Sequence, residues 1–298
     1  MNRSLPIAAL SLLLVSGCDQ NAAGKSVTKR SRPLVYATIH PLEFFVLRLA
    51  GDIVDCEVAM PYGEAPQHWI PDRATLAKLA AADMVVLHGE LESWQSKVGL
   101  PRSRQSIVCT GFEQHFIKIK NAITHTHGNK AHTHDGVDPF LWLDLSLAGK
   151  EAAVVARALK HLLPKHAKTI DANLDTLQRD LAKELAAQIA VAIPTKTICT
   201  TERLYDYWAL AASVKTVNLD LHDAKGIAAA RASVAAQQSR LALCPSTPDA
   251  ALQKTLAGLG LTAVVFDPCF TVRAGQDFLE VMAANRTRLQ KALQASGK

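Results

Sequence analysis

Residues 165–191 read KHAKTIDANLDTLQRDLAKELAAQIAV, and this stretch decides how the rest of the chain is organised. Its apolar side chains recur at three- and four-residue spacing, which is the pattern of one buried face of an α-helix. Pro164 separates it from a shorter helical pattern over residues 148–163. A helix of about 27 residues is roughly 40 Å long. We therefore expect it to span the molecule and to connect two folded regions.

The regions on either side of this helix alternate between strand-like and helix-like segments. Before it, we expect strands at 34–39, 53–60, 84–87 and 106–109 and helices at 41–50, 72–82 and 90–97. After it, we expect strands at 196–200, 214–219, 240–243 and 262–266 and helices at 202–212, 224–238, 248–258 and 276–295. Such alternation predicts mainly parallel sheets flanked by helices. The predicted fold is α/β, with two lobes, a cleft between them and one long linking helix.

The first residues resemble an export signal. Arg3 precedes an apolar run over residues 5–15, which is shorter than the roughly 20 residues that cross a bilayer. Small residues stand directly before Cys18, as a lipoprotein signal peptidase requires. We expect diacylation of Cys18 and a location in the periplasm or on the outer face of a bacterial membrane. A simple secretory signal is the alternative.

Five segments follow from these patterns. We expect a signal peptide at 1–17, a lipidated flexible leash at 18–32, an N-terminal lobe at 33–147, a helical connection at 148–193 and a C-terminal lobe at 194–298.

The composition excludes several classes of function. The formal charge of +6 comes partly from the leash, and no basic patch is interleaved with aromatic residues, so we expect no nucleic-acid partner. The chain contains no nucleophile elbow, phosphate-binding glycine loop or His-Glu-x-x-His motif, so we do not expect an enzyme. We expect a monomer.

A histidine-rich segment at 124–136 separates the first lobe from the helical connection. Four of the eleven histidines lie in it: His125, His127, His132 and His134. Neutral imidazole is the commonest protein ligand for zinc and similar metals. We expect a mobile loop that captures metal, and a solvated polar loop is the alternative.

Other metal-binding side chains follow the predicted strands. In open α/β sheets, ligands bind beyond the carboxyl ends of the strands. The candidates for a metal site in the cleft are His40, His68, His88, Glu202, His222 and Asp267.

Five cysteines remain after Cys18, and none forms a Cys-x-x-Cys pair. Cys244 and Cys269 each follow a strand of the second lobe. Neighbouring strands are about 4.8 Å apart, which a disulfide can bridge. A Cys244–Cys269 disulfide and two reduced thiols are therefore the alternatives.

Several motifs together resemble the zinc/manganese family of periplasmic solute-binding proteins of ABC transporters. The resemblance extends from Val35 to the C-terminus. The matching segments are Ala37-Thr-Ile-His-Pro-Leu, Ala50-Gly-Asp, Pro66-Gln-His-Trp-Ile-Pro, Leu79-Ala-Ala-Ala-Asp, Asp138-Pro-Phe-Leu-Trp-Leu-Asp, Tyr205-Asp-Tyr-Trp, Phe266-Asp-Pro-Cys and Asn285. The resemblance implies a Zn²⁺ or Mn²⁺ ligand, a membrane permease as partner and a long helix that limits the motion of the lobes.

The usual ligands of that family are mostly replaced. Gln67 stands where the first histidine is usual, with His68 one position later. Phe140 and Glu202 correspond to the second and third histidines, and only the carboxylate of Asp267 matches.

These substitutions leave three hypotheses for the function. The cleft binds a divalent transition metal through an altered ligand set drawn from the candidates above. Alternatively, the cleft has lost its site and the histidine-rich segment acts as a zinc buffer or chaperone. In the third hypothesis, the protein binds no metal and is an accessory lipoprotein or binds another solute.

Overall fold

The computed structural model describes residues 30–95, 102–127, 130–272 and 276–296, and it describes only the backbone over 120–135. Residues 32–298 form one compact unit. The predicted signal peptide, Cys18 and most of the predicted leash lie outside the described residues.

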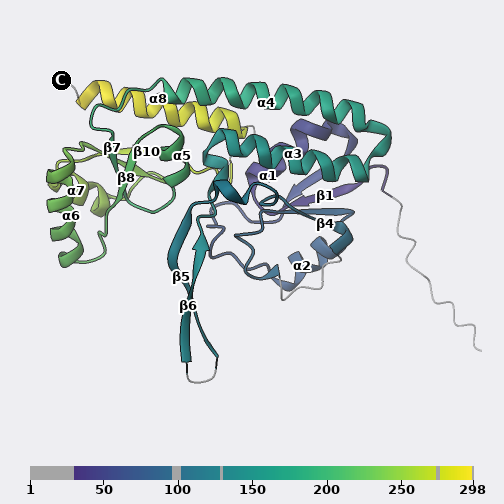
Figure 1. Ribbon diagram of the computed structural model, residues 1–298, viewed down its shortest axis with the longest axis horizontal. Coiled ribbons are helices and arrows are strands. Elements are labelled where there is room, and N and C mark those ends of the chain that lie inside the picture. The colour runs from purple at the N-terminus through teal and green to yellow at the C-terminus, as the bar shows by residue number, and fades with distance from the viewer. Residues whose placement is uncertain (1–29, 96–101, 128–129, 273–275, 297–298) are drawn as a thin grey trace, which may run out of the picture. The chain divides into compact units, whose positions relative to one another are not determined.

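Two four-stranded sheets, both entirely parallel, form the centre of this unit (Figure 1). The first has the order β2-β1-β3-β4, with β1 at Leu34–Ala37, β2 at Asp55–Val58, β3 at Met84–Leu87 and β4 at Gln105–Ile107. The second has the order β10-β9-β7-β8, with β7 at Thr197–Thr200, β8 at Lys215–Asn218, β9 at Leu241–Cys244 and β10 at Thr262–Val265. Both sheets have the same topology, and the predicted α/β fold with two parallel sheets is confirmed.

Eight α-helices connect and cover these strands in the described residues. They are α1 His40–Ala50, α2 Arg73–Ala80, α3 Leu145–Leu162, α4 Ala167–Ile189, α5 Asp206–Ala211, α6 Ala224–Gln237, α7 Ala250–Gly258 and α8 Phe278–Ser296. Short 3₁₀ helices occur at Gly51–Ile53, Arg102–Arg104, Glu113–His115, Leu141–Leu143 and Pro164–His166. No helix among the described residues is long and apolar enough to cross a membrane.

The linking helix α4 is shorter than expected because Pro164–His166 form a separate 3₁₀ turn before it. It packs against α1, α3 and α8, and it lies beside α8 in Figure 1. Its buried face carries Ile170, Leu177 and Leu181. The guanidinium of Arg286 on α8 binds Glu184 on α4, with Nε 2.9 Å from Oε1. The helix is therefore fixed along its length by both apolar and polar contacts.

The predicted helix at 90–97 is wrong for its described part, because residues 90–94 form bends and a turn and residue 95 is 3₁₀-helical, with no α-helix among them. The cause is Glu92. Its carboxylate accepts hydrogen bonds from the backbone amides of His88 and Gly89, at 3.0 and 2.7 Å. These bonds fold the chain back on itself directly after β3.

The histidine-rich segment is not a loop. It forms an antiparallel hairpin of β5 Lys118–His127 and β6 Lys130–Val137, which extends away from the sheets in Figure 1. The sequence His-Thr-His on each side of the turn alternates with period two, which suits a strand, and threonine favours extended backbone.

Candidate metal centre

A cavity of about 600 Å³ is lined by residues that follow strands of both sheets. Its lining consists of Gln67, Pro139, Phe140, Thr201, Glu202, Arg203, Leu204, Asn218, Leu219, Asp220 and His222. The three positions that the family resemblance assigns to the usual histidine ligands, now Gln67, Phe140 and Glu202, are all among them. These three positions, far apart in the sequence, therefore lie around one cavity.

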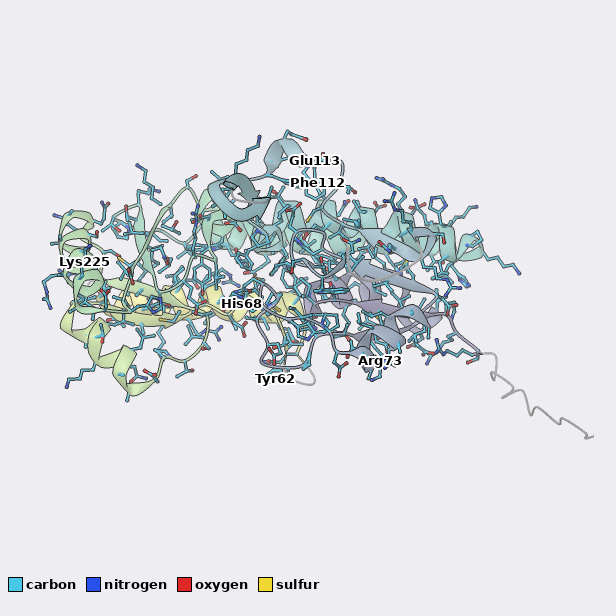
Figure 2. All side chains as sticks on the ribbon, turned by 90° about the horizontal axis from the view of Figure 1, so that it is seen from below. Tyr62, His68, Arg73, Phe112, Glu113 and Lys225 are labelled. Carbon is cyan, nitrogen blue, oxygen red and sulfur yellow. The ribbon has the colours of Figure 1, made fainter. Side chains whose placement is uncertain are left out.

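Gln67 and not His68 lines this cavity. The Gln67 Oε1 atom is buried and has no hydrogen-bond partner among the described residues. The backbone turns after Ala65, whose carbonyl accepts from the amide of His68 at 3.0 Å. As a result, the His68 side chain is exposed to solvent (Figure 2).

Phe140 has become part of the apolar core. Its ring centroid lies 5.7 Å from that of Trp142 and 5.6 Å from that of Phe270. The indole Nε1 of Trp142 donates to the carbonyl of Pro268 at 2.8 Å. These contacts join the segment before α3 to the segment after β10, and they form an apolar wall where a ligand is usual.

Glu202 and His222 are exposed side chains in the loops after β7 and β8. The backbone amide of His222 donates to Asp220 Oδ1 at 3.2 Å. Gly226 on α6 allows this arrangement, because a Cβ atom there would lie 2.7 Å from the carbonyl oxygen of Asp220. The loop thus presents one imidazole and one carboxylate to the same cavity as Glu202.

The remaining candidates lie elsewhere. His40 is buried, and its Nδ1 is 2.8 Å from Glu43 Oε2 while its Nε2 has no partner among the described residues. Asp267 lines a second cavity of about 490 Å³, and its Oδ1 accepts from the amide of Cys269 at 2.7 Å. His88 is fully buried beside β3. Of the six candidates, the structure brings Glu202 and His222 to one cavity.

His88 belongs to a buried cluster with Cys109 and Glu151. In the described part of the chain, it is the one group of at least three histidine, cysteine or acidic residues whose ligand atoms lie within 4.8 Å of one another. Sequence reasoning missed Cys109 and Glu151, which come from the loop after β4 and from α3. A signal for Glu151 existed, because it interrupts the apolar face that includes Ala148, Ala152 and Val155.

The hairpin register relates the four histidine positions. His125 is opposite His132, and His134 is opposite Ile123. Residues two apart in a strand and residues directly opposite across strands share a face. The backbone therefore places positions 125, 127, 132 and 134 on one face of the hairpin.

The Cys244–Cys269 disulfide is not formed in the structure, in which both residues are free thiols. The register pairs Cys244 with Val265, four residues before Cys269. Pro268 and the positive φ of 62° at Cys269 mark a turn after β10. Burial raises the pKa of both thiols, so they remain protonated.

Comparisons with known proteins agree with this fold. The sequence profile described as "ZnuA: Zinc-uptake complex component A periplasmic" matches residues 35–292. "Zinc-binding protein AdcA" of Streptococcus pyogenes is 23% identical in an alignment 318 positions long, which covers 97% of this chain and 61% of AdcA. The "Iron ABC transporter substrate-binding lipoprotein MtsA" of Streptococcus pyogenes is 25% identical and covers 70% of this chain and 67% of MtsA.

Among solved structures, the "Metal-dependent Lipoprotein YcdH" from Bacillus subtilis has a TM-score of 0.74 at 17% identity. The match covers 87% of this chain and 98% of YcdH. At this identity, the likeness shows the fold alone. The chain spans about 61% of the length of AdcA. Because the family profile covers residues 35–292, nearly the whole described chain, this protein belongs to the ZnuA family, the periplasmic components A of zinc-uptake complexes.

Proposed function

We propose that this chain is an extracytoplasmic solute-binding protein that captures a divalent transition metal and delivers it to the permease of an ABC importer. The observation that carries this proposal is the cavity of about 600 Å³, because it joins the three positions that hold ligands in the family to His222 and Asp220. The names of AdcA and MtsA, a zinc-binding and an iron-transport protein, support a divalent metal as the solute.

The proposed ligands are the carboxylate of Glu202 and the imidazole of His222. The carbonyl oxygen of Gln67 and the carboxylate of Asp220 complete the set. The ligand atoms of Glu202, Asp220 and His222 do not all lie within 4.8 Å of one another in the structure, so binding requires these side chains to rotate toward the ion. One nitrogen and several oxygens make a harder donor set than three imidazoles, so preference for zinc is weaker and Mn²⁺ or Fe²⁺ is admitted. A metal that binds Glu202 also neutralises the charge that this carboxylate carries near the apolar wall of Phe140.

The cavity is held by a rigid frame. Besides the contact of Trp142 with Pro268, the amide of Ile117 donates to the hydroxyl of Tyr207 at 2.9 Å. The amide of His40 donates to the carbonyl of Phe270 at 3.3 Å. Large closure around the metal would break these contacts. We therefore expect small motion of the cavity walls on binding, and release of the metal when the permease separates Glu202 from Gln67.

Substitution tests this ligand set. Glu202→Gln and His222→Ala are each expected to weaken binding of zinc and manganese by at least about tenfold in titration calorimetry, since the first removes the negative charge of a ligand and the second removes the nitrogen donor. His68→Ala is the matched control, because this histidine is adjacent to Gln67 but exposed. An equal effect of all three substitutions, or no effect of any, would refute the proposal.

The hairpin supports a second function, a zinc buffer that loads the cleft. Its register places four histidine positions on one face, and cross-strand neighbours have Cβ atoms about 4.5–5.5 Å apart. Such pairs can share a metal ion, but a pair supplies two of the four protein ligands that a structural zinc site has, so this binding is weak. Replacing the four histidines by serine should remove weak zinc equivalents and leave the cleft site. Loss of all zinc binding in that variant would make the hairpin the principal site.

A further inference from the structure

The cluster of His88, Cys109 and Glu151 does not line the cavity that contains Glu202 and His222, and the proposed transport function does not use it. The relative exposure of these residues is 0%, 7% and 0%. His88 Nε2 is 3.2 Å from Glu151 Oε1 and 3.2 Å from Cys109 Sγ. The third side, from Cys109 Sγ to Glu151 Oε1, is 4.0 Å. A point equidistant from the three atoms is about 2 Å from each, close to the Zn–N and Zn–O distances of proteins.

The chemistry of the three donors suits a divalent metal. A thiolate and a carboxylate carry two negative charges, and a neutral imidazole adds a third donor, so the loaded cluster would have no net charge. Neutrality matters here because an uncompensated charge in an apolar interior is strongly destabilising. The combination of sulfur, nitrogen and oxygen donors is typical of zinc.

The protein does not supply hydrogen-bond partners for both carboxylate oxygens of Glu151. Its Oε2 atom is buried and has no hydrogen-bond partner among the described residues. Across the same residues, its one ion-pair partner within 4.0 Å is His88, and no lysine or arginine pairs with it. Apolar residues of α3 and the ring of Trp142, 5.3 Å from His88 between centroids, enclose the pair. A cation would satisfy both oxygens of this carboxylate.

We propose that His88, Cys109 and Glu151 bind one zinc ion, with Glu151 as a bidentate ligand, in a structural site that is separate from the transport cavity. Cys109 Sγ is 3.4 Å from Nδ1 as well as 3.2 Å from Nε2, so it lies against the imidazole ring. Zinc binding at Nε2 therefore requires the Cys109 side chain to rotate, so that its sulfur faces Nε2 alone.

Binding of zinc to this cluster has two further consequences. The Cys109 thiol loses its proton to solvent when the Zn–S bond forms. Burial and the nearby Glu151 raise the pKa of this thiol, so the cluster without metal keeps it protonated. Because all three residues are buried, the ion enters while the chain folds and exchanges slowly afterwards. The cluster therefore retains its zinc under conditions that remove metal from the transport cavity.

Retention of zinc and its coordination by sulfur test the proposal. The full chain is purified without metal-affinity resin and dialysed against EDTA at neutral pH. Residual zinc is then measured by mass spectrometry and X-ray absorption. We expect about one equivalent, with one sulfur at ~2.3 Å. The proposed ligands of the cleft and the hairpin histidines include no cysteine, so a sulfur signal separates this site from the transport function even if the cleft binds nothing.

Variants assign the signal to the cluster. Cys109→Ser and Glu151→Gln should each lower the retained zinc to below about 0.1 equivalent, whereas Cys199→Ser, which changes another buried thiol, should retain it. Zinc below about 0.1 equivalent in the unmodified chain, retained zinc without sulfur, or equal retention in Cys109→Ser would overturn the proposal. If a variant does not fold, the absorption spectrum of the unmodified chain still decides it.

Discussion

The side chain of Gln67 ends in a buried oxygen that no described residue satisfies, and it lines the cavity with Glu202 and His222. An imidazole at this position would add a nitrogen donor to the proposed ligand set. Gln67→His is therefore expected to tighten zinc binding by about tenfold and to affect manganese less, because zinc prefers nitrogen to oxygen. Calorimetry with both metals checks this. Unchanged zinc affinity would mean that Gln67 does not face the ion.

Phe140, at another family ligand position, behaves differently because its ring is embedded between Trp142 and Phe270. Replacing it by histidine removes apolar packing, with a cost of roughly 1–3 kcal/mol in the free energy of unfolding. We accordingly expect Phe140→His to lower stability in denaturant titrations. A variant as stable as the unmodified chain would show that this ring does not support the wall of the cavity.

Asp138 should make stability depend on pH. Burial raises the pKa of its carboxyl to about 7, and its Oδ1 accepts from the amide of Phe140 at 3.0 Å. The unfolded chain has a pKa near ~3.9, so between these values the folded state binds more protons and stability falls as pH rises. Asp138→Asn keeps the acceptor and stays neutral. Its stability relative to the unmodified chain should therefore increase by on the order of 1–3 kcal/mol between pH 5 and pH 8 in urea titrations. A difference that does not change with pH would contradict the raised pKa.

For single residues, the sequence predicted which positions line the cavity better than it predicted which side chains contact one another. Gln67, Phe140 and Glu202 were placed by motif, and all three line one cavity. The direction of each side chain depends on tertiary packing, which no local pattern contains. His88 follows a strand just as Glu202 does, yet it points into the core because Cys109 and Glu151 meet it there.

Among the elements, the β5–β6 hairpin is the most independent, since its strands pair with each other and extend away from the sheets (Figure 1). Replacing residues 121–135 by a short glycine-serine connection should leave the melting temperature of the remaining chain within about 2 °C. The same change should remove the weak zinc equivalents. Differential scanning calorimetry and zinc titration check both results, with the four-serine variant as the matched control. A large loss of stability in the deletion alone would mean that the hairpin backbone supports the fold.

The hairpin also shows where element prediction failed. Its histidine pairs were interpreted by composition as a loop, although His-Thr-His has the period of a strand. The predicted helix at 90–97 failed for a related reason, since the bonds of Glu92 to two backbone amides are invisible to helical periodicity. Long elements with repeated apolar spacing, such as α3 and α4, were predicted to within a few residues.

For the whole molecule, the alternation of strands and helices was sufficient to predict two parallel sheets. The common strand order of the two sheets was not predictable, because it depends on contacts between segments far apart in the sequence. The anchoring of the chain remains a prediction from residues 15–18. Mass spectrometry of the native N-terminus should find a diacylglyceryl group on Cys18, and a soluble mature chain that begins elsewhere would contradict it.

We propose that the cavity lined by Glu202 and His222 captures the transported metal. The most direct test is an anomalous difference map, recorded at the zinc absorption edge from crystals of the four-serine variant grown with zinc. We predict a peak about 2.0–2.2 Å from both the Glu202 carboxylate and the His222 imidazole. Zinc bound only outside this cavity, with no peak beside Glu202 or His222, would contradict the account.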